Sequence, residues 1–192
     1  DRGDEILTEA SDPGSGFLAE VCKEWEASVL AAGRLGVRVA VLRFGMVLAR
    51  DGGALARLVP LFRLGLGGRV GSGRQWVSWI HVADLSRMIR WALAPSGPRG
   101  VVNAVAPGAV RNSEFTRCLA RELRRPALLP APAFALRVAL GEMASVLLSS
   151  QRVVPEVAER GGFPFRYGNL SEALRDLISA ESARRPREPR RG

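Results

Sequence analysis

The fold of this chain is decided by one apolar stretch, Val37-Arg38-Val39-Ala40-Val41-Leu42-Arg43-Phe44-Gly45-Met46-Val47-Leu48. The stretch is rich in β-branched and aliphatic residues. Turn residues flank it, with Gly33 and Gly36 before it and Asp51-Gly52-Gly53 after it. A continuous apolar run with such boundaries is typical of a strand that is buried on both faces, as in a parallel sheet.

A polar residue, Arg43, interrupts this stretch near its carboxyl end, and Gly45 follows closely. Open α/β sheets bind their ligands outside the carboxyl ends of the strands. We therefore interpret the segment Arg43–Val47 as a candidate ligand edge. The stretch alone leaves a second interpretation open, in which the arginine only reaches solvent past the edge of the core.

The chain around this strand alternates between helical and strand patterns. Apolar residues recur at helical spacing in residues 17–32, 54–64 and 85–93, and another helix is expected to begin at Asn112 or Ser113. Short β-branched segments at 76–82 and 100–105 predict further strands. This alternation predicts an α/β fold, part of a doubly wound sheet.

The alternation of helix and strand patterns ends at about residue 125, and prolines at positions 126, 130 and 132 mark a boundary there. We expect residues 1–125 to form one domain and residues 126–180 a small, mainly helical second one. The second domain would contain an apolar helix over 134–148 and a last helix from about residue 170, capped by Asn169 or Ser171. Residues 181–192 are arginine-rich with two prolines, so we expect a disordered basic tail.

The net charge of +9 and the pI near 11.3 would suit a nucleic-acid partner. However, only one of the 28 basic residues is a lysine, so 28 − 1 = 27 are arginines, which indicates a global compositional bias. Residues 184–192 carry five arginines against one glutamate, or +4 of the total, and no aromatic residues alternate with the basic ones. We therefore do not expect nucleic acid as a partner.

Three features bear on the cellular compartment. No apolar run approaches the roughly 18 uncharged residues of a membrane span, so we expect no membrane association. The opening Asp1-Arg2-Gly3-Asp4-Glu5 resembles neither a signal nor a transit peptide, and without an initial methionine the chain is expected to be part of a longer or processed protein. Cys22 and Cys118 lie far apart and are expected to be reduced, buried thiols in a cytoplasmic protein.

The segment 65–73 is rich in glycine but does not match a dinucleotide-binding loop. Its spacing, Gly65-x-Gly67-x-x-x-Gly71, is not G-x-G-x-x-G, and no strand precedes it and no helix follows it. We predict instead a flexible substrate loop over residues 65–80. A purely connecting loop is the alternative.

The lone histidine, His81, has no second histidine or cysteine pair nearby, so we expect no metal site. Two roles remain open for it: a structural bond to the backbone or to Asp84, or a ligand-facing position. Neither cysteine has a histidine in an arrangement that would activate a thiol. The residues alone therefore predict a soluble α/β protein with a ligand edge at Arg43–Val47.

Several segments, in this order, resemble the extended short-chain dehydrogenase/reductase superfamily. Arg43–Leu48 resembles its strand-end segment R-P-x-N-V-Y-G, Trp79–Leu85 is similar to its F-I-H-V-x-D-V segment, and Val102–Val105 resembles its later V-Y-N-V strand. Residues from Phe62 to His81 look like the atypical, sugar-nucleotide-epimerase-like subfamily. That subfamily carries a small C-terminal domain of unknown function, which the segment from Gly141 to Phe163 fits.

The resemblance implies that this chain is the C-terminal part of a Rossmann-like domain that binds NADP or NAD. The glycine fingerprint for the cofactor pyrophosphate belongs to the first strand–helix unit of that fold, before residue 1. The implied cofactor contacts, made by backbone groups, are Phe44, Gly45, Met46 and Val47. The implied contacts to an unknown small-molecule substrate are Arg43, Arg74, Gln75 and Trp76.

The catalytic Tyr-x-x-x-Lys of the superfamily is expected on the helix at 17–32. If the glutamate that follows this motif is aligned on Glu26, Leu18 takes the place of the tyrosine and Cys22 that of the lysine. Leucine cannot transfer a proton, and a neutral thiol cannot lower a tyrosine pKa as an ammonium group does. The sequence therefore identifies no catalytic residue.

Three functions remain open at this stage. The first is an NAD(P)-dependent oxidoreductase or epimerase-like enzyme of unknown substrate. The second is an NAD(P)-binding regulatory or redox-sensing module without catalysis, which the Leu18 and Cys22 substitutions favour. The third is a basic interaction module, which a steep salt dependence of binding would reveal.

Overall fold

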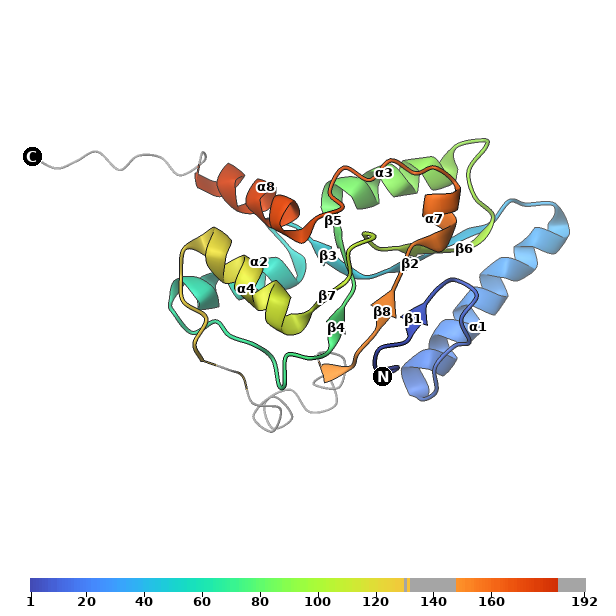
Figure 1. Cartoon of the computed structure of the whole chain (residues 1–192). Helices are drawn as coiled ribbons and strands as arrows, with labels where there is room; N and C mark the ends of the chain where they lie inside the picture. The colour runs from blue at the N-terminus through green and yellow to red at the C-terminus, as the bar shows by residue number, and fades with distance from the viewer. Residues whose placement is uncertain (130, 132–147, 183–192) are drawn as a thin grey trace, which may run out of the picture.

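The computed structural model of the chain describes residues 1–129, 131 and 148–182 (Figure 1). The expected apolar helix over 134–148 falls almost wholly outside the described residues, as does the basic tail beyond residue 182. Within the described part the secondary structure is mixed, and the expected α/β class is confirmed.

The strands are short, and most come in pairs that are distant in sequence. They are β1 (Ile6–Leu7), β2 (Ala40–Phe44), β3 (Met46–Leu48), β4 (Trp76–Val77), β5 (Trp79–His81), β6 (Gly100–Ala104), β7 (Val110–Arg111) and β8 (Arg152–Val153). The helices are α1 (Phe17–Ala31), a 3-10 turn η1 (Ala32–Leu35), α2 (Gly53–Arg63), α3 (Val82–Leu93), α4 (Asn112–Leu123), α7 (Glu156–Arg160) and α8 (Leu170–Ser182).

Parallel pairing organises the centre of the molecule. β2 pairs with β6 from Ala40↔Gly100 to Phe44↔Ala104, and β3 pairs with β5 through Val47↔Ile80. β1 also pairs in parallel with β8, whereas β4 and β7 are antiparallel. The parallel pairing agrees with the prediction, but the expected burial on both faces does not hold for this stretch. The residues of β2 are only partly buried or, at Phe44, exposed, and within β2 and β3 only Leu48 is fully buried.

The predicted long strand is divided at Gly45, where the chain passes from one partner strand to another. The Gly45 N–H donates to the Ala104 carbonyl of β6 at 3.3 Å, and the next N–H, of Met46, donates to the Ser78 carbonyl at 2.8 Å. A side chain on Gly45 would lie 2.7 Å from the Ser78 carbonyl oxygen and 2.7 Å from Val105 Cγ1. Only glycine therefore allows the three backbones to approach this closely.

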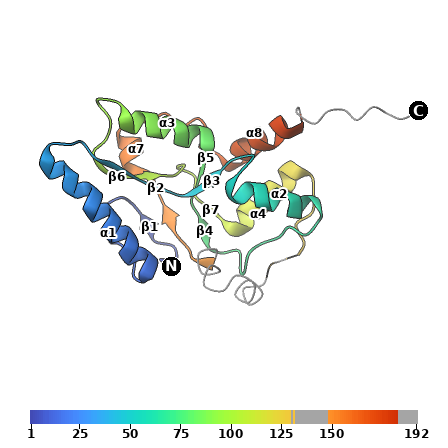
Figure 2. The same cartoon turned by 180° about the vertical axis from the view of Figure 1, so that it is seen from behind.

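Helices cover the sheet on both sides (Figures 1 and 2). α3 and α7 lie on one side of the β2–β6 pair and α1 on the other, while α2, α4 and α8 gather around β3 and β5. Two apolar clusters fill the space between them. One joins Leu48 and Trp79 to Leu119 of α4 and Leu174 of α8, and the other packs β5, β6 and α3 onto Phe163.

The N-terminal part of the chain holds features that the sequence did not predict. It contains β1, which pairs with a strand about 146 residues later in the chain. Gly16 precedes the first turn of α1, and no side chain caps this helix. Cys22 is exposed rather than buried, because α1 has no buried residue in the described structure.

The C-terminal residues 148–182 pack directly on the preceding part of the chain. α8 lies against α4, and its residues Leu174 and Leu177 belong to the same core cluster as Trp79. Asn169 caps α8, because its Oδ1 accepts the N–H of Ser171 at 2.9 Å and, at 3.4 Å, that of Glu172. The division of the chain into domains at residue 126 stays a prediction.

We expect Gly45→Ala to lower the free energy of unfolding by about 1–3 kcal/mol, because the added methyl group has no room between Ser78 and Val105. Gly33→Ala is the matched control, since a Cβ there meets nothing within 4 Å. Its stability should stay equal or rise by up to about 1 kcal/mol. Urea denaturation of both variants checks this, and equal stabilities would show that the close approach at Gly45 is not a constraint.

Candidate cofactor and substrate site

The first feature of the candidate ligand edge is an ion pair between β2 and α1. Arg43 Nε and Nη2 donate to the two carboxylate oxygens of Glu26 at 2.7 and 2.6 Å. This two-pronged bond raises the pKa of Arg43 and lowers the pKa of Glu26. The predicted substrate residue Arg43 is therefore already engaged by the neighbouring helix, and its contact with a substrate stays a prediction.

The strand tip that follows offers few free backbone groups. The N–H groups of Gly45 and Met46 are bonded within the sheet, and Val47 pairs with Ile80 of β5. The Phe44 side chain, by contrast, is 56% exposed at the end of β2. If the tip faces a cofactor, the exposed ring of Phe44 is the group most open to it. The role of residues 44–47 in cofactor binding stays a prediction.

The sequence analysis did not single out Glu9, which lies in the N-terminal segment beside this edge. Its Oε1 accepts the N–H of Asn103 at 2.9 Å and that of Val157 at 3.3 Å, so it ties β6 to α7. Its Oε2 is buried and has no hydrogen-bond partner among the described residues. No local pattern could have indicated this residue, because both of its partners are more than 90 positions away.

The predicted substrate residues 74–76 form a separate network around an aromatic ring. Two guanidinium groups lie over the Trp76 ring, that of Arg111 at 4.2 Å and that of Arg152 at 4.5 Å from the ring centroid. Its Nε1 donates to Asp4 at 2.9 Å, and Asp4 also pairs with Arg111 at 2.6 Å. Two cations thus contact the indole, which spacing in the sequence could not reveal.

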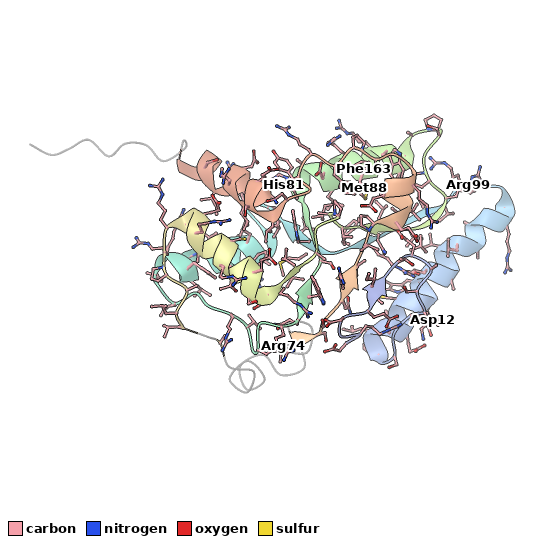
Figure 3. All side chains as sticks on the ribbon, in the orientation of Figure 1. Asp12, Arg74, His81, Met88, Arg99 and Phe163 are labelled. Atoms are coloured by element: carbon pink, nitrogen blue, oxygen red, sulfur yellow. The ribbon has the colours of Figure 1, made fainter. Side chains whose placement is uncertain are left out.

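The other two residues of this segment have different environments. Gln75 is buried, and its Nε2 donates to the Val70 carbonyl at 3.0 Å, so it supports the glycine-rich loop. Arg74 is exposed (Figure 3). Its backbone carbonyl accepts a bond from Arg111. The loop itself is anchored, because the Val70 N–H donates to Asn112 Oδ1 at 2.8 Å. Its role as a substrate loop stays a prediction.

Asp84 supports the scaffold. Its carboxylate accepts the backbone N–H groups of Arg166, at 3.0 and 3.1 Å, and of Tyr167, at 2.8 Å. It also pairs with Arg87 at 2.9 Å and is only 1% exposed. A buried carboxylate with this many donors holds the segment before α8 in place.

The positions that would carry a catalytic tyrosine and lysine hold Leu18 and Cys22, and both are exposed on α1. The only tyrosine, Tyr167, is buried at the other end of the fold, where its ring stacks on His81. No tyrosine therefore faces Arg43, and the described residues supply no hydroxyl–ammonium pair at this edge.

Two further findings concern the described residues as a whole. Among residues 1–129, 131 and 148–182, no group of three or more His, Cys, Asp or Glu side chains could hold a metal ion. No helix in this part of the chain is long and apolar enough to cross a membrane.

The fold and the strand-end edge define the class: an α/β protein with a Rossmann-like parallel sheet, of the kind found in epimerases and short-chain dehydrogenases. The family model described as "Domain of unknown function (DUF1731)" matches residues 131–177. These matches support an epimerase-like, short-chain dehydrogenase-like protein.

The chain is also similar to individual epimerase family proteins. The chain is 47% identical over 173 residues to "Epimerase family protein SDR39U1 homolog, chloroplastic" from Arabidopsis thaliana, covering 90% of this chain and 50% of that protein. It resembles the solved structure of human epimerase family protein SDR39U1 (isoform2) with NADPH, with a TM-score of 0.84, 35% identity, and coverage of 92% of this chain and 60% of that one.

A second solved structure, the nucleoside-diphosphate sugar epimerase from Corynebacterium glutamicum, matches with a TM-score of 0.76 and 37% identity. That match covers 94% of this chain and 35% of the other. The chain spans about half the length of the curated relatives that it matches. The expected cytoplasmic location stays a prediction, since one relative is named chloroplastic.

We expect Glu26→Gln to lower the free energy of unfolding by roughly 1 kcal/mol, because it removes the charge from a half-exposed, two-pronged ion pair. Because pairing lowers the Glu26 pKa, its stabilisation is present above the ordinary glutamate pKa and is lost as the pH falls through the lowered value. Glu20→Gln, which breaks an exposed pair with Lys23, should cost less than about 0.5 kcal/mol.

Urea denaturation at pH 7 and again at about pH 3 measures the difference between these two variants and the parent chain. The Glu26→Gln deficit should shrink at the lower pH, because below the ordinary glutamate pKa the unfolded parent chain binds a proton at this carboxylate more readily than the folded chain does. Equal losses for the two variants at pH 7 would contradict a structural role for the pair between Arg43 and Glu26.

Proposed function

We propose that this chain is the C-terminal part of an NAD(P)-dependent, epimerase-like protein of the short-chain dehydrogenase superfamily. The observation that carries the proposal is the carboxyl end of β2, where Arg43 is fixed by Glu26 and the strand bends at Gly45 into β3. In open α/β sheets this edge is where ligands bind. The similarity to a human relative solved with NADPH supports the same cofactor class.

In the proposed site, Phe44, Gly45, Met46 and Val47 lie beside the nicotinamide half of the cofactor. The bonded N–H groups of Gly45 and Met46 hold the tip in shape, and the exposed Phe44 ring supplies contact area. The cofactor would accept or donate a hydride when it is bound. The pyrophosphate would be held by a part of the intact protein that precedes residue 1.

We propose further that Arg43, Arg74, Gln75 and Trp76 border the substrate. Arg74 is exposed, so its guanidinium can pair with a phosphate or carboxylate group. Two arginines already lie over the Trp76 ring, so in the proposed site this ring holds the cations in place rather than stacking on a substrate.

A second candidate function is an NAD(P)-binding regulatory or redox-sensing module. The specific observation in its favour is the pair Leu18 and Cys22, which stands where the superfamily has its proton-transfer residues. The two candidates differ in turnover. The intact enzyme should oxidise NADPH with at least one member of a panel of aldehydes and ketones, whereas a sensor would bind NADPH tightly and remain silent.

We expect Phe44→Ala in the intact protein to weaken NADPH binding about tenfold, which is equivalent to roughly 1.4 kcal/mol, because it removes an exposed aromatic contact at the strand tip. Isothermal titration calorimetry measures this. Leu35→Ala is the control, because that side chain is 83% exposed on the 3-10 turn after α1 and should leave the affinity unchanged.

The same measurement on residues 1–192 alone, with circular dichroism to verify folding, should show binding at least about a hundredfold weaker than for the intact protein. Micromolar affinity of this chain by itself would mean that the cofactor site has been misplaced. Unchanged affinity of the Phe44→Ala variant would remove the strand tip from the site.

A further inference from the structure

The lone histidine of the chain lies in a closed cluster that the proposed function does not use. His81 is the last residue of β5 and immediately precedes α3, and its side chain is almost completely buried (Figure 3). The Tyr167 ring stacks on the imidazole, with ring centroids 3.9 Å apart and the planes 21° from parallel. Asp176 of α8 closes the cluster from the other side.

The hydrogen bonds determine which imidazole nitrogen carries the proton. His81 Nδ1 accepts the backbone N–H of Ala83 at 3.0 Å, and this bond caps the N-terminus of α3. An acceptor nitrogen needs a free lone pair, so the neutral ring carries its proton on Nε2. Nε2 lies 3.4 Å from Asp176 Oδ2, too far for a strong hydrogen bond in the neutral state.

Protonation is incompatible with this cap. A charged imidazole has N–H groups at both nitrogens, so Nδ1 would point a hydrogen at the Ala83 N–H instead of accepting from it. The charge would also lie at the N-terminus of α3, where the helix dipole disfavours a cation. The ring could keep its charge only by leaving Ala83 and moving toward Asp176, which is half exposed to solvent.

The groups that face His81 from all packed elements act in opposite directions. Burial and the Arg166 cation lower the pKa of His81, whereas the carboxylates of Asp176 on α8 and Asp84 on α3 raise it, and burial prevails. Tyr167 stays neutral, because burial and its bond to Asp176 raise its pKa. The neutral ring is therefore favoured in the folded state more than in an unfolded chain.

We propose that His81 is a pH-sensitive latch that holds the segment 166–176, including the first half of α8, against the end of β5 and the start of α3. When the ring is neutral, it caps α3 and supports Tyr167. When it is protonated, it leaves Ala83 and takes away the surface on which Tyr167 stacks.

The consequences of opening follow from the contacts of the segment. The backbone of Arg166 and Tyr167 is tied to Asp84, at the start of the same helix α3. α8 continues from this segment and buries Leu174 and Leu177 in the core. When His81 is protonated at low pH, the packing of α8 on the core therefore weakens. The apolar face of α8 that carries Leu174 and Leu177 then becomes accessible to solvent.

The direction of the pH dependence follows from the lowered pKa. Above the ordinary histidine pKa of about 6.5 both folded and unfolded chains hold a neutral ring, and the latch is closed. As the pH falls below that value, the unfolded or opened form binds a proton more readily, so opening becomes easier. Opening should increase by up to about tenfold for each unit by which the pKa is lowered.

Hydrogen exchange on the intact protein tests the proposal. After correction for the chemical exchange rate, the amides of 83–84 and 166–177 should open several-fold more at pH 5.5 than at pH 7.5, whereas those of β2 and β6 should not change. In His81→Asn the side chain can still cap α3 but does not titrate in this range, so the difference should vanish. An equal pH response in this variant would overturn the proposal.

A second measurement covers the case in which His81→Asn does not fold. The imidazole resonance of His81, followed by proton NMR, should titrate below 6.5 in the parent protein. Asp176→Asn, which removes a carboxylate that favours the charged ring, should move this midpoint further down. A parent midpoint at or above 6.5, or an upward shift in Asp176→Asn, would show that His81 is not the latch.

Discussion

The rest of this structure depends on one constraint, the change of partner strand at Gly45. Before this residue β2 pairs in parallel with β6, and after it β3 pairs in parallel with β5. Because Gly45 lacks a side chain, one strand can serve two partners in succession, first β6 and then β5. The two core clusters lie on either side of this exchange, one under α3 and α7 and the other under α2, α4 and α8. This arrangement fixes the position of residues 44–47, the strand tip at the carboxyl end of β2.

The chemistry at that edge is unusual for the class that the fold defines. A guanidinium fixed by Glu26 and an exposed aromatic ring remain at the tip, but α1 presents Leu18 and Cys22 where a proton donor and an ammonium group would be expected. Proton transfer would then need a group from outside the described residues or from the substrate itself. This is why cofactor binding and catalysis are separate questions for this protein.

The sequence predicted those features that depend on local pattern. Apolar spacing located α1, α3 and β6 to within a few residues, because such periodicity is set by neighbours in the chain. It could not locate β1, or the division of the long strand at Gly45, because both depend on partners distant in sequence. The same limit holds at the site, where the strand end was identifiable but the two arginines that contact Trp76 were not.

The pairing of β1 with β8 has a consequence for biosynthesis. Ile6 pairs with Arg152, so 152 − 6 = 146 residues must be added before the partner strand exists. At about 5–20 residues per second, translation takes roughly 7 to 30 s to cover that distance. During this interval β1 has no β8 to pair with, so this part of the sheet can form only late in synthesis.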